Sequence, residues 1–86
     1  MVELNRLVNK TNLLLNCIRH LDNGTHGFKN IRREKHWRRD VNTMVSKVSS
    51  YMANPTPELI GQADVVVTDL LDEAWLGIAY LQRDRV

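Results

Sequence analysis

The residues best suited to chemistry in this sequence are six cations gathered between Lys29 and Arg39, with one acid, Glu34, among them. Arginine presents a planar fork of N–H donors that matches phosphate oxygens, and lysine adds a compact point charge. On a helix, Arg32, Lys35 and Arg39 would share one face. The segment therefore indicates that the protein binds an anionic ligand. The candidate ligand-binding residues are Phe28, Lys29, Arg32, Arg33, Lys35, Arg38 and Arg39.

Two kinds of phosphate-bearing ligand fit this segment, a nucleic acid and a cyclic nucleotide. With a nucleic acid the cations would mainly contact backbone phosphates, which gives salt-dependent affinity and little sequence choice. Phe28 would either stack on a base or pin its loop to the core, and an exposed edge of Trp37 is a second stacking surface. The start of the following helix can also attract an anion. An acidic protein surface is the alternative partner.

Other reactive side chains give weaker indications. Cys17 and His20 lie three residues apart, within reach of one helical face, but a lone helical cysteine is usually part of the packing. The three histidines do not follow the spacing of a zinc motif. Asp69, Asp72 and Glu73 share a helical face, yet the chain offers few further carboxylates to complete a metal site. We therefore expect a non-enzymatic protein with no metal and no cofactor.

The 86 residues allow one domain with a modest core, and 43% hydrophobic residues argue against disorder. Cys17 is the only cysteine, so an internal disulfide is impossible. The opening residues carry charges, and the longest aliphatic run there is Leu13–Leu15, too short for a membrane span. We expect a cytoplasmic protein that does not enter a membrane.

Charge is distributed unevenly along the chain. Residues 1–50 hold ten basic and four acidic residues, whereas residues 51–86 hold two basic and six acidic residues. Either the two halves match within or between subunits, or a basic ligand surface is backed by an acidic one. Small chains without disulfides are often stabilised by association, so we expect a homo-oligomer.

Apolar residues at alternating spacings of three and four predict three helices, over about 2–22, 31–53 and 57–82. The first stripe is Leu4, Leu7, Thr11, Leu14, Ile18 and Leu21, and the second is Trp37, Val41, Met44, Val48 and Tyr51. Asn30 is suited to cap the second helix, and Pro55 ends it. Thr56 before Pro57 predicts the start of the third helix.

The third segment is open to a second interpretation, because residues 63–69 also resemble a buried parallel strand followed by an acidic loop. A parallel strand needs sheet partners, and no other segment is a β-branched run. As a helix, its expected inner face is Leu59, Ala63, Val66, Leu70, Ala74, Gly77 and Leu81, flanked by Ile60, Val67, Leu71 and Ile78. The predicted fold is all-α, a three-helix antiparallel bundle that forms one domain over residues 1–86.

Two short motifs resemble the phage anti-CBASS proteins, small helical-hairpin proteins that sequester cyclic oligonucleotides between subunits. The motifs are Gly27-Phe28-Lys29-Asn30-Ile31 and Thr68-Asp69-Leu70, the latter followed by Ala74 and an apolar run to Leu81. The resemblance implies an anti-defence factor of a phage or mobile element, in which Phe28 stacks on a base and Lys47 or another basic residue meets phosphate. The family typically has Tyr at the position of Phe28, and residues 2–22 have no counterpart there. An inhibitor that docks its basic helix on a nucleic-acid-handling enzyme is the alternative.

Overall fold

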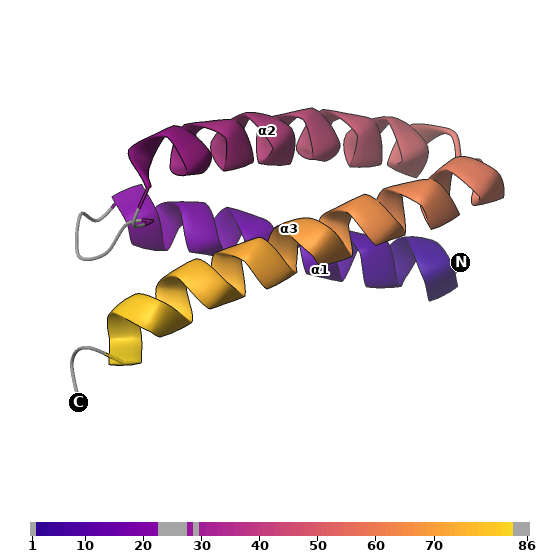
Figure 1. Ribbon diagram of the computed structural model, residues 1–86. Coiled ribbons are helices and arrows are strands. Elements are labelled where there is room, and N and C mark those ends of the chain that lie inside the picture. The colour runs from indigo at the N-terminus through magenta and orange to yellow at the C-terminus, as the bar shows by residue number, and fades with distance from the viewer. Residues whose placement is uncertain (1, 23–27, 29, 84–86) are drawn as a thin grey trace.

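A computed structural model describes residues 2–22, 28 and 30–83, with side chains as far as residue 75 (Figure 1). It consists of three helices, α1 (Val2–Asp22), α2 (Ile31–Ala53) and α3 (Pro57–Arg83). Every pair of helices is in contact. The all-α class is confirmed, and the predicted helix bounds agree with the observed ones to within one residue. Residues 63–69 are helical, so the interpretation as a strand is wrong.

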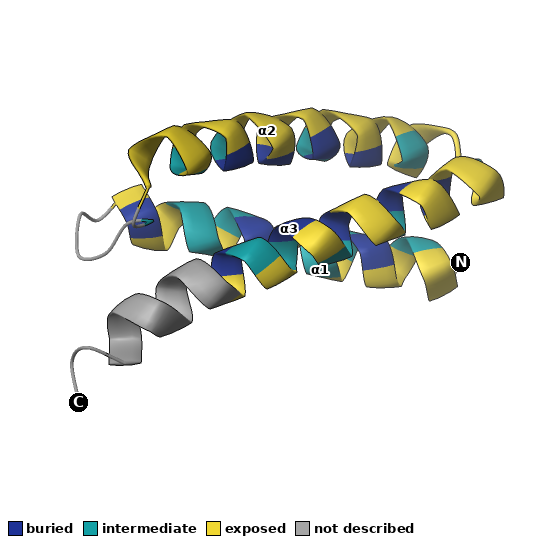
Figure 2. Cartoon of the chain, in the orientation of Figure 1, coloured by how far each residue is buried: buried dark blue, intermediate teal, exposed yellow. Residues whose placement is uncertain are grey.

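One apolar core is shared by the three helices, and in Figure 2 the buried residues line their facing sides. Most of the predicted stripes of α1 and α2 are buried: Leu7, Leu14 and Leu21 from α1, and Trp37, Val41, Met44 and Val48 from α2. The other apolar members, Leu4, Ile18 and Tyr51, are partly buried against this core. A chain of this size buries a smaller fraction of its unfolded surface than a larger domain does. Loss of any one of these buried side chains therefore removes a noticeable fraction of the free energy of unfolding.

The inner face of α3 differs from the predicted one at two positions, where the buried residue is the predicted flanking neighbour, one place further along the chain. Ile60 and Val67 are buried, whereas Leu59 and Val66 remain 42% and 44% exposed. Both members of each adjacent pair are aliphatic, so spacing alone did not identify the buried one. The other three described positions of the predicted stripe, Ala63, Leu70 and Ala74, are buried as expected. The burial of Gly77 and Leu81 lies outside what the structure describes.

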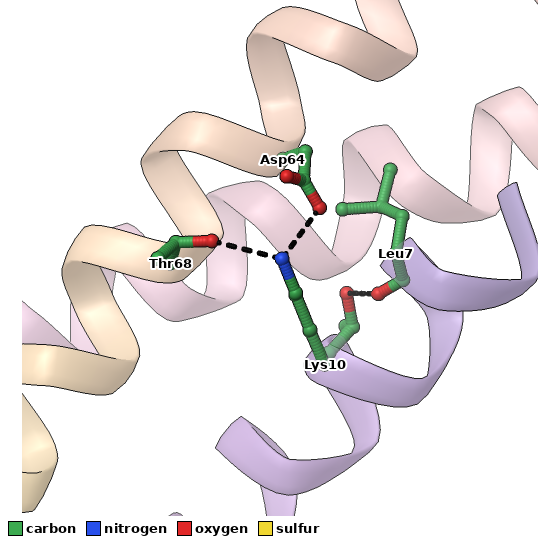
Figure 3. Close-up of polar contacts among 5 residues, drawn as sticks. Leu7, Lys10, Asp64 and Thr68 are labelled. Atoms are coloured by element: carbon green, nitrogen blue, oxygen red, sulfur yellow. Dashed lines mark hydrogen bonds and ion pairs between the residues drawn. The ribbon is translucent and has the colours of Figure 1, made fainter. Parts of the chain in front are cut away.

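A polar contact fixes how α1 and α3 lie against each other. Lys10 reaches across from α1, and its Nζ donates to Oδ1 of Asp64 at 2.9 Å and to Oγ1 of Thr68 at 3.1 Å (Figure 3). All three side chains are partly buried. Beside them Thr11, the one polar residue in the described part of the core, donates its hydroxyl to the Leu7 carbonyl. The core therefore has its polar groups satisfied at this level of the structure.

Within the residues described, none of the three helices combines the length and the apolar character that crossing a membrane requires.

Candidate functional site

The basic segment begins at a helix start whose donors are already occupied. Asn30 has an extended backbone, and its side-chain oxygen accepts from the amides of Arg32 and Arg33 at 2.9 and 3.2 Å. Its carbonyl accepts the next amide, that of Glu34. The predicted cap is confirmed. Because the cap uses these N–H groups, the α2 N-terminus offers fewer free donors to an anion than a bare helix start would.

The aromatic residues of the segment belong to the core. Trp37 is 1% exposed, and its Nε1–H donates to the Leu70 carbonyl of α3 at 2.8 Å. Phe28 is half-buried, with its ring centroid 5.3 Å from that of Trp37 at an interplanar angle of 41°. The backbone amide of Phe28 donates to Glu34 at 2.9 Å. Trp37 therefore has no exposed edge for a base, and the side chain of Phe28 packs against the core.

Two of the predicted cations make ion pairs within the chain. Arg38 is half-buried and contacts Asp22 of α1 at 2.8 Å and Glu34 of its own helix at 3.5 Å. Arg33 lies 3.4 Å from Glu73 of α3, with 69% of its own side chain exposed. Of these pairs only Arg33–Glu73 joins the basic half to the acidic half, so the match between the halves is partly internal. Arg38 is largely committed to holding the end of α1 against α2.

Arg32, Lys35 and Arg39 form the free part of the segment. All three are exposed, and none has an acidic partner among the residues described. They lie on the side of α2 that faces away from the other helices, which is exposed along its length in Figure 2. Trp37 and Val41 occupy the opposite side. Lys29, the remaining predicted residue, lies outside the described residues.

The same side of α2 continues with hydroxyl groups that the sequence reading did not single out. Thr43, Ser46 and Ser50 are exposed and follow Arg39 at spacings of four, three and four. At 3.6 residues per turn, these residues and the three cations lie within about 80° of arc. We call this set the outer face of α2: Arg32, Lys35, Arg39, Thr43, Ser46 and Ser50. In the sequence, the signal is that the hydroxyl residues continue the spacing of three and four begun by the cations.

Lys47, which the family resemblance would bring to a phosphate, lies away from the outer face. It lines a shallow pocket of about 160 Å³ between α2 and α3, together with Tyr51, Leu59 and Val66. A second pocket of about 170 Å³ lies between the first turns of α1 and α3, around Arg6, Gly61 and Asp64. Neither pocket includes a residue of the outer face.

Chemistry that needs a thiolate or a clustered metal site finds little support in the described part of the chain. Cys17 is half-buried, and burial raises the pKa of its thiol. An activated cysteine needs the opposite shift, toward a lower pKa. Across residues 2–22, 28 and 30–75, no three His, Cys, Asp or Glu side chains gather as a metal would require.

We expect Cys17 to react slowly with iodoacetamide in the folded protein. The raised pKa reduces the thiolate fraction at pH 8, and partial burial limits access, so alkylation proceeds more slowly than for a free cysteine. Raising the pH toward the folded-state pKa should accelerate it. Mass spectrometry of timed samples, with protein in 6 M guanidinium as the reference, measures both rates. Equal rates in the two conditions would contradict the expected protection.

No protein-family model, curated protein or solved structure matches this chain significantly.

Proposed function

We propose that this protein binds a phosphate-bearing ligand, a nucleic acid or a cyclic nucleotide, without catalysing a reaction. The observation that carries the proposal is the trio of exposed cations on the outer face of α2. Arg32, Lys35 and Arg39 have no acidic partner in the described structure, whereas Arg33 and Arg38 do. Cations that served only to pair the two halves of the chain would be expected to face carboxylates. An unpaired group of three on one face is suited to phosphate oxygens.

Within this proposal the residues of the segment divide into two roles. Arg32, Lys35 and Arg39 contact the ligand, and Arg33 can swing to it because its pair with Glu73 is exposed and weak. Arg38 and Phe28 position the segment by holding the start of α2 against α1 and the core. Lys29 completes the candidate set by its place in the sequence.

A protein-interaction inhibitor is the second candidate, in which the basic face docks on an acidic surface of a nucleic-acid-handling enzyme. The observation in its favour is that the basic segment already contacts carboxylates, at Asp22, Glu34 and Glu73. A surface rich in such groups would satisfy the free cations in the same way.

We further propose an antiparallel three-helix bundle that assembles into a homo-oligomer in the cytoplasm. The antiparallel arrangement is supported by the contacts of Arg33 with Glu73 and of Trp37 with Leu70. Between these two contacts the residue number rises along α2 and falls along α3, as it does for helices that run in opposite directions. Assembly is supported by Val65 and Trp75 of α3, which are 62% and 70% exposed. An anti-defence role of the kind held by phage cyclic-oligonucleotide sponges is compatible with such an assembly.

The proposal predicts that the Arg32→Ala/Arg39→Ala variant loses phosphate-ligand binding. We would measure fluorescence polarisation at 50 mM salt with three labelled probes: a 20-base-pair DNA duplex, a 20-nucleotide single strand and a cyclic dinucleotide. At least one probe should bind the wild-type protein. Removing two of three phosphate contacts should weaken that binding by tenfold or more, since hydrogen bonds to charged groups contribute about 1.5–3 kcal/mol each.

A matched control removes the same charge elsewhere. Arg6 and Arg19 are exposed on α1, away from the outer face, so Arg6→Ala/Arg19→Ala changes net charge equally. This control should retain binding within about twofold. Absorbance at 260 nm of material released from the purified protein gives an independent readout. The proposal is abandoned if no probe binds, or if both double variants weaken binding alike.

A further inference from the structure

We infer that the ligand is the sugar-phosphate backbone of a double-stranded nucleic acid, lying along the whole outer face of α2. This inference rests on the proposed function and specifies its ligand. Three observations lead to it: the convexity of the site, its lack of aromatic residues, and the hydroxyl groups that extend it beyond the cations.

The first observation concerns shape. The three free cations lie on the outside of a helix, with the core on the opposite side. Sites for small molecules are concave and surround most of the ligand, whereas a convex helix face touches a ligand along one side only. The two pockets described above are lined by other residues. An extended polyanion fits this surface better than a compact cyclic nucleotide does.

The second observation separates double from single strands. Proteins that hold single strands supply exposed aromatic rings on which the bases stack. The outer face of α2 has none: Phe28 and Trp37 pack together in the core, and the exposed Trp75 belongs to α3. A ligand whose bases are already stacked in a duplex needs no such platform, and only its phosphates have to be met.

The third observation concerns length. From Arg32 to Ser50 the outer face extends about 27 Å at 1.5 Å per residue. Arg32 and Arg39 lie about 10 Å apart, a span of roughly three phosphates at 3.4 Å of axis per phosphate on one strand. Ser46 and Ser50 continue the row, and serine hydroxyls are common donors to phosphate oxygens. No acidic residue interrupts the six positions of this face.

Of the three hydroxyl groups on the outer face of α2, one already donates a hydrogen bond within the protein. Thr43 Oγ1 donates to the Arg39 carbonyl at 3.1 Å, within its own helix. Ser46 and Ser50 make no such bond in the described structure. An extended sugar-phosphate backbone would contact these two serines, whereas a ligand that contacts only the three cations would not. The serines therefore distinguish the two kinds of ligand.

The test compares Ser46→Ala/Ser50→Ala with wild type, using the same duplex, single strand and cyclic dinucleotide. Alanine favours a helix more than serine does, so the variant keeps its fold. Duplex affinity should fall roughly tenfold through the loss of two hydrogen bonds to phosphate. The matched control is Ser49→Ala, because Ser49 is exposed on the same helix about 75° or more from the centre of the outer face. It should leave duplex affinity unchanged.

Salt dependence gives the second readout. Phosphate contacts of Arg32, Lys35 and Arg39 alone, without Arg33 and Lys29, predict a slope of log K against log salt near −2.7, or about 40-fold weaker duplex binding at 200 mM than at 50 mM salt. Serine removal should lower affinity without changing this slope, since the serines carry no charge. Removing Arg32 and Arg39 should reduce the slope to about −0.9.

The outcomes separate this inference from the proposed function. If the single strand or the cyclic dinucleotide binds more tightly than the duplex, and the serine variant behaves as wild type, the duplex inference is overturned while the proposed function stands. If none of the probes binds, both are overturned. Dimers that dissociate on removal of Arg32 and Arg39, with no probe bound, would instead assign this face to an interface between two copies.

Discussion

Replacing Trp37 by alanine is expected to destabilise the protein by about 3–5 kcal/mol, the largest effect of any single substitution considered. The side chain is 1% exposed, lies between Phe28 and the carbonyl of Leu70, and joins α2 to α3. Its removal leaves a large cavity and withdraws the indole donor from Leu70. Since native proteins are stable by only about 5–15 kcal/mol, this loss is a large fraction of the total stability. Urea unfolding followed by far-ultraviolet circular dichroism measures the loss.

Trp37→Phe provides the comparison that keeps this prediction interpretable. Phenylalanine retains most of the ring volume and loses the bond to Leu70, so the expected loss is about 1–3 kcal/mol. The variant should fold, with a urea midpoint between those of wild type and Trp37→Ala. A Trp37→Ala protein as stable as wild type would show that the ring does not occupy the core position described here.

The second large effect is expected at Leu14, which is fully buried in the middle of α1. Leu14→Ala should cost about 2–5 kcal/mol, because it removes buried apolar surface and leaves a cavity facing both other helices. The same urea experiment measures it, with the slope of the transition checked for a change in the unfolded state.

Its neighbour Leu13 supplies a matched control in the adjacent position. Leu13 is 54% exposed, so Leu13→Ala should change stability by no more than about 0.5 kcal/mol. The pair tests the rotation of α1 about its own axis, since both variants lose the same atoms from the same helix. Similar losses for the two would mean that α1 presents a different face to the core.

The helices and most of the core could be predicted from spacing alone. Polar residues occupy the side of α1 and of α2 that lies opposite the apolar stripe, so the stripe is the face of each helix that enters the core, even though Leu13–Leu15 of α1 are adjacent aliphatic residues. α3 lacks that separation at Leu59–Ile60 and Val66–Val67, where neighbouring positions are equally apolar. Which of each pair is buried depends on how α3 rotates against α1 and α2, and that rotation is not encoded in the local pattern.

The candidate site was only partly predictable for a related reason. Density of charge identified the segment, and helical spacing grouped Arg32, Lys35 and Arg39. Sequence could not separate Arg33 from these, because its partner Glu73 is 40 positions away. For Arg38 the spacing of four from Glu34 predicts one ion pair, which is confirmed at 3.5 Å, but its second partner Asp22 is 16 positions away. Ion pairs between helices depend on tertiary packing, and packing decided which cations remain free for a ligand.

The contact of Lys10 with Asp64 and Thr68 also bears on the order in which the chain assembles. It joins residues 54 and 58 positions apart, so it closes a longer loop than any other side-chain hydrogen bond in the described residues. A hairpin of α1 and α2 closes a much shorter loop and can form before α3 arrives. In that order of events, the Lys10 amine stays hydrated until α3 docks in the one alignment that brings the oxygens of Asp64 and Thr68 to it. Because this polar contact forms last, it favours chains in which α3 is correctly aligned over chains in which the apolar face of α3 packs one turn out of register.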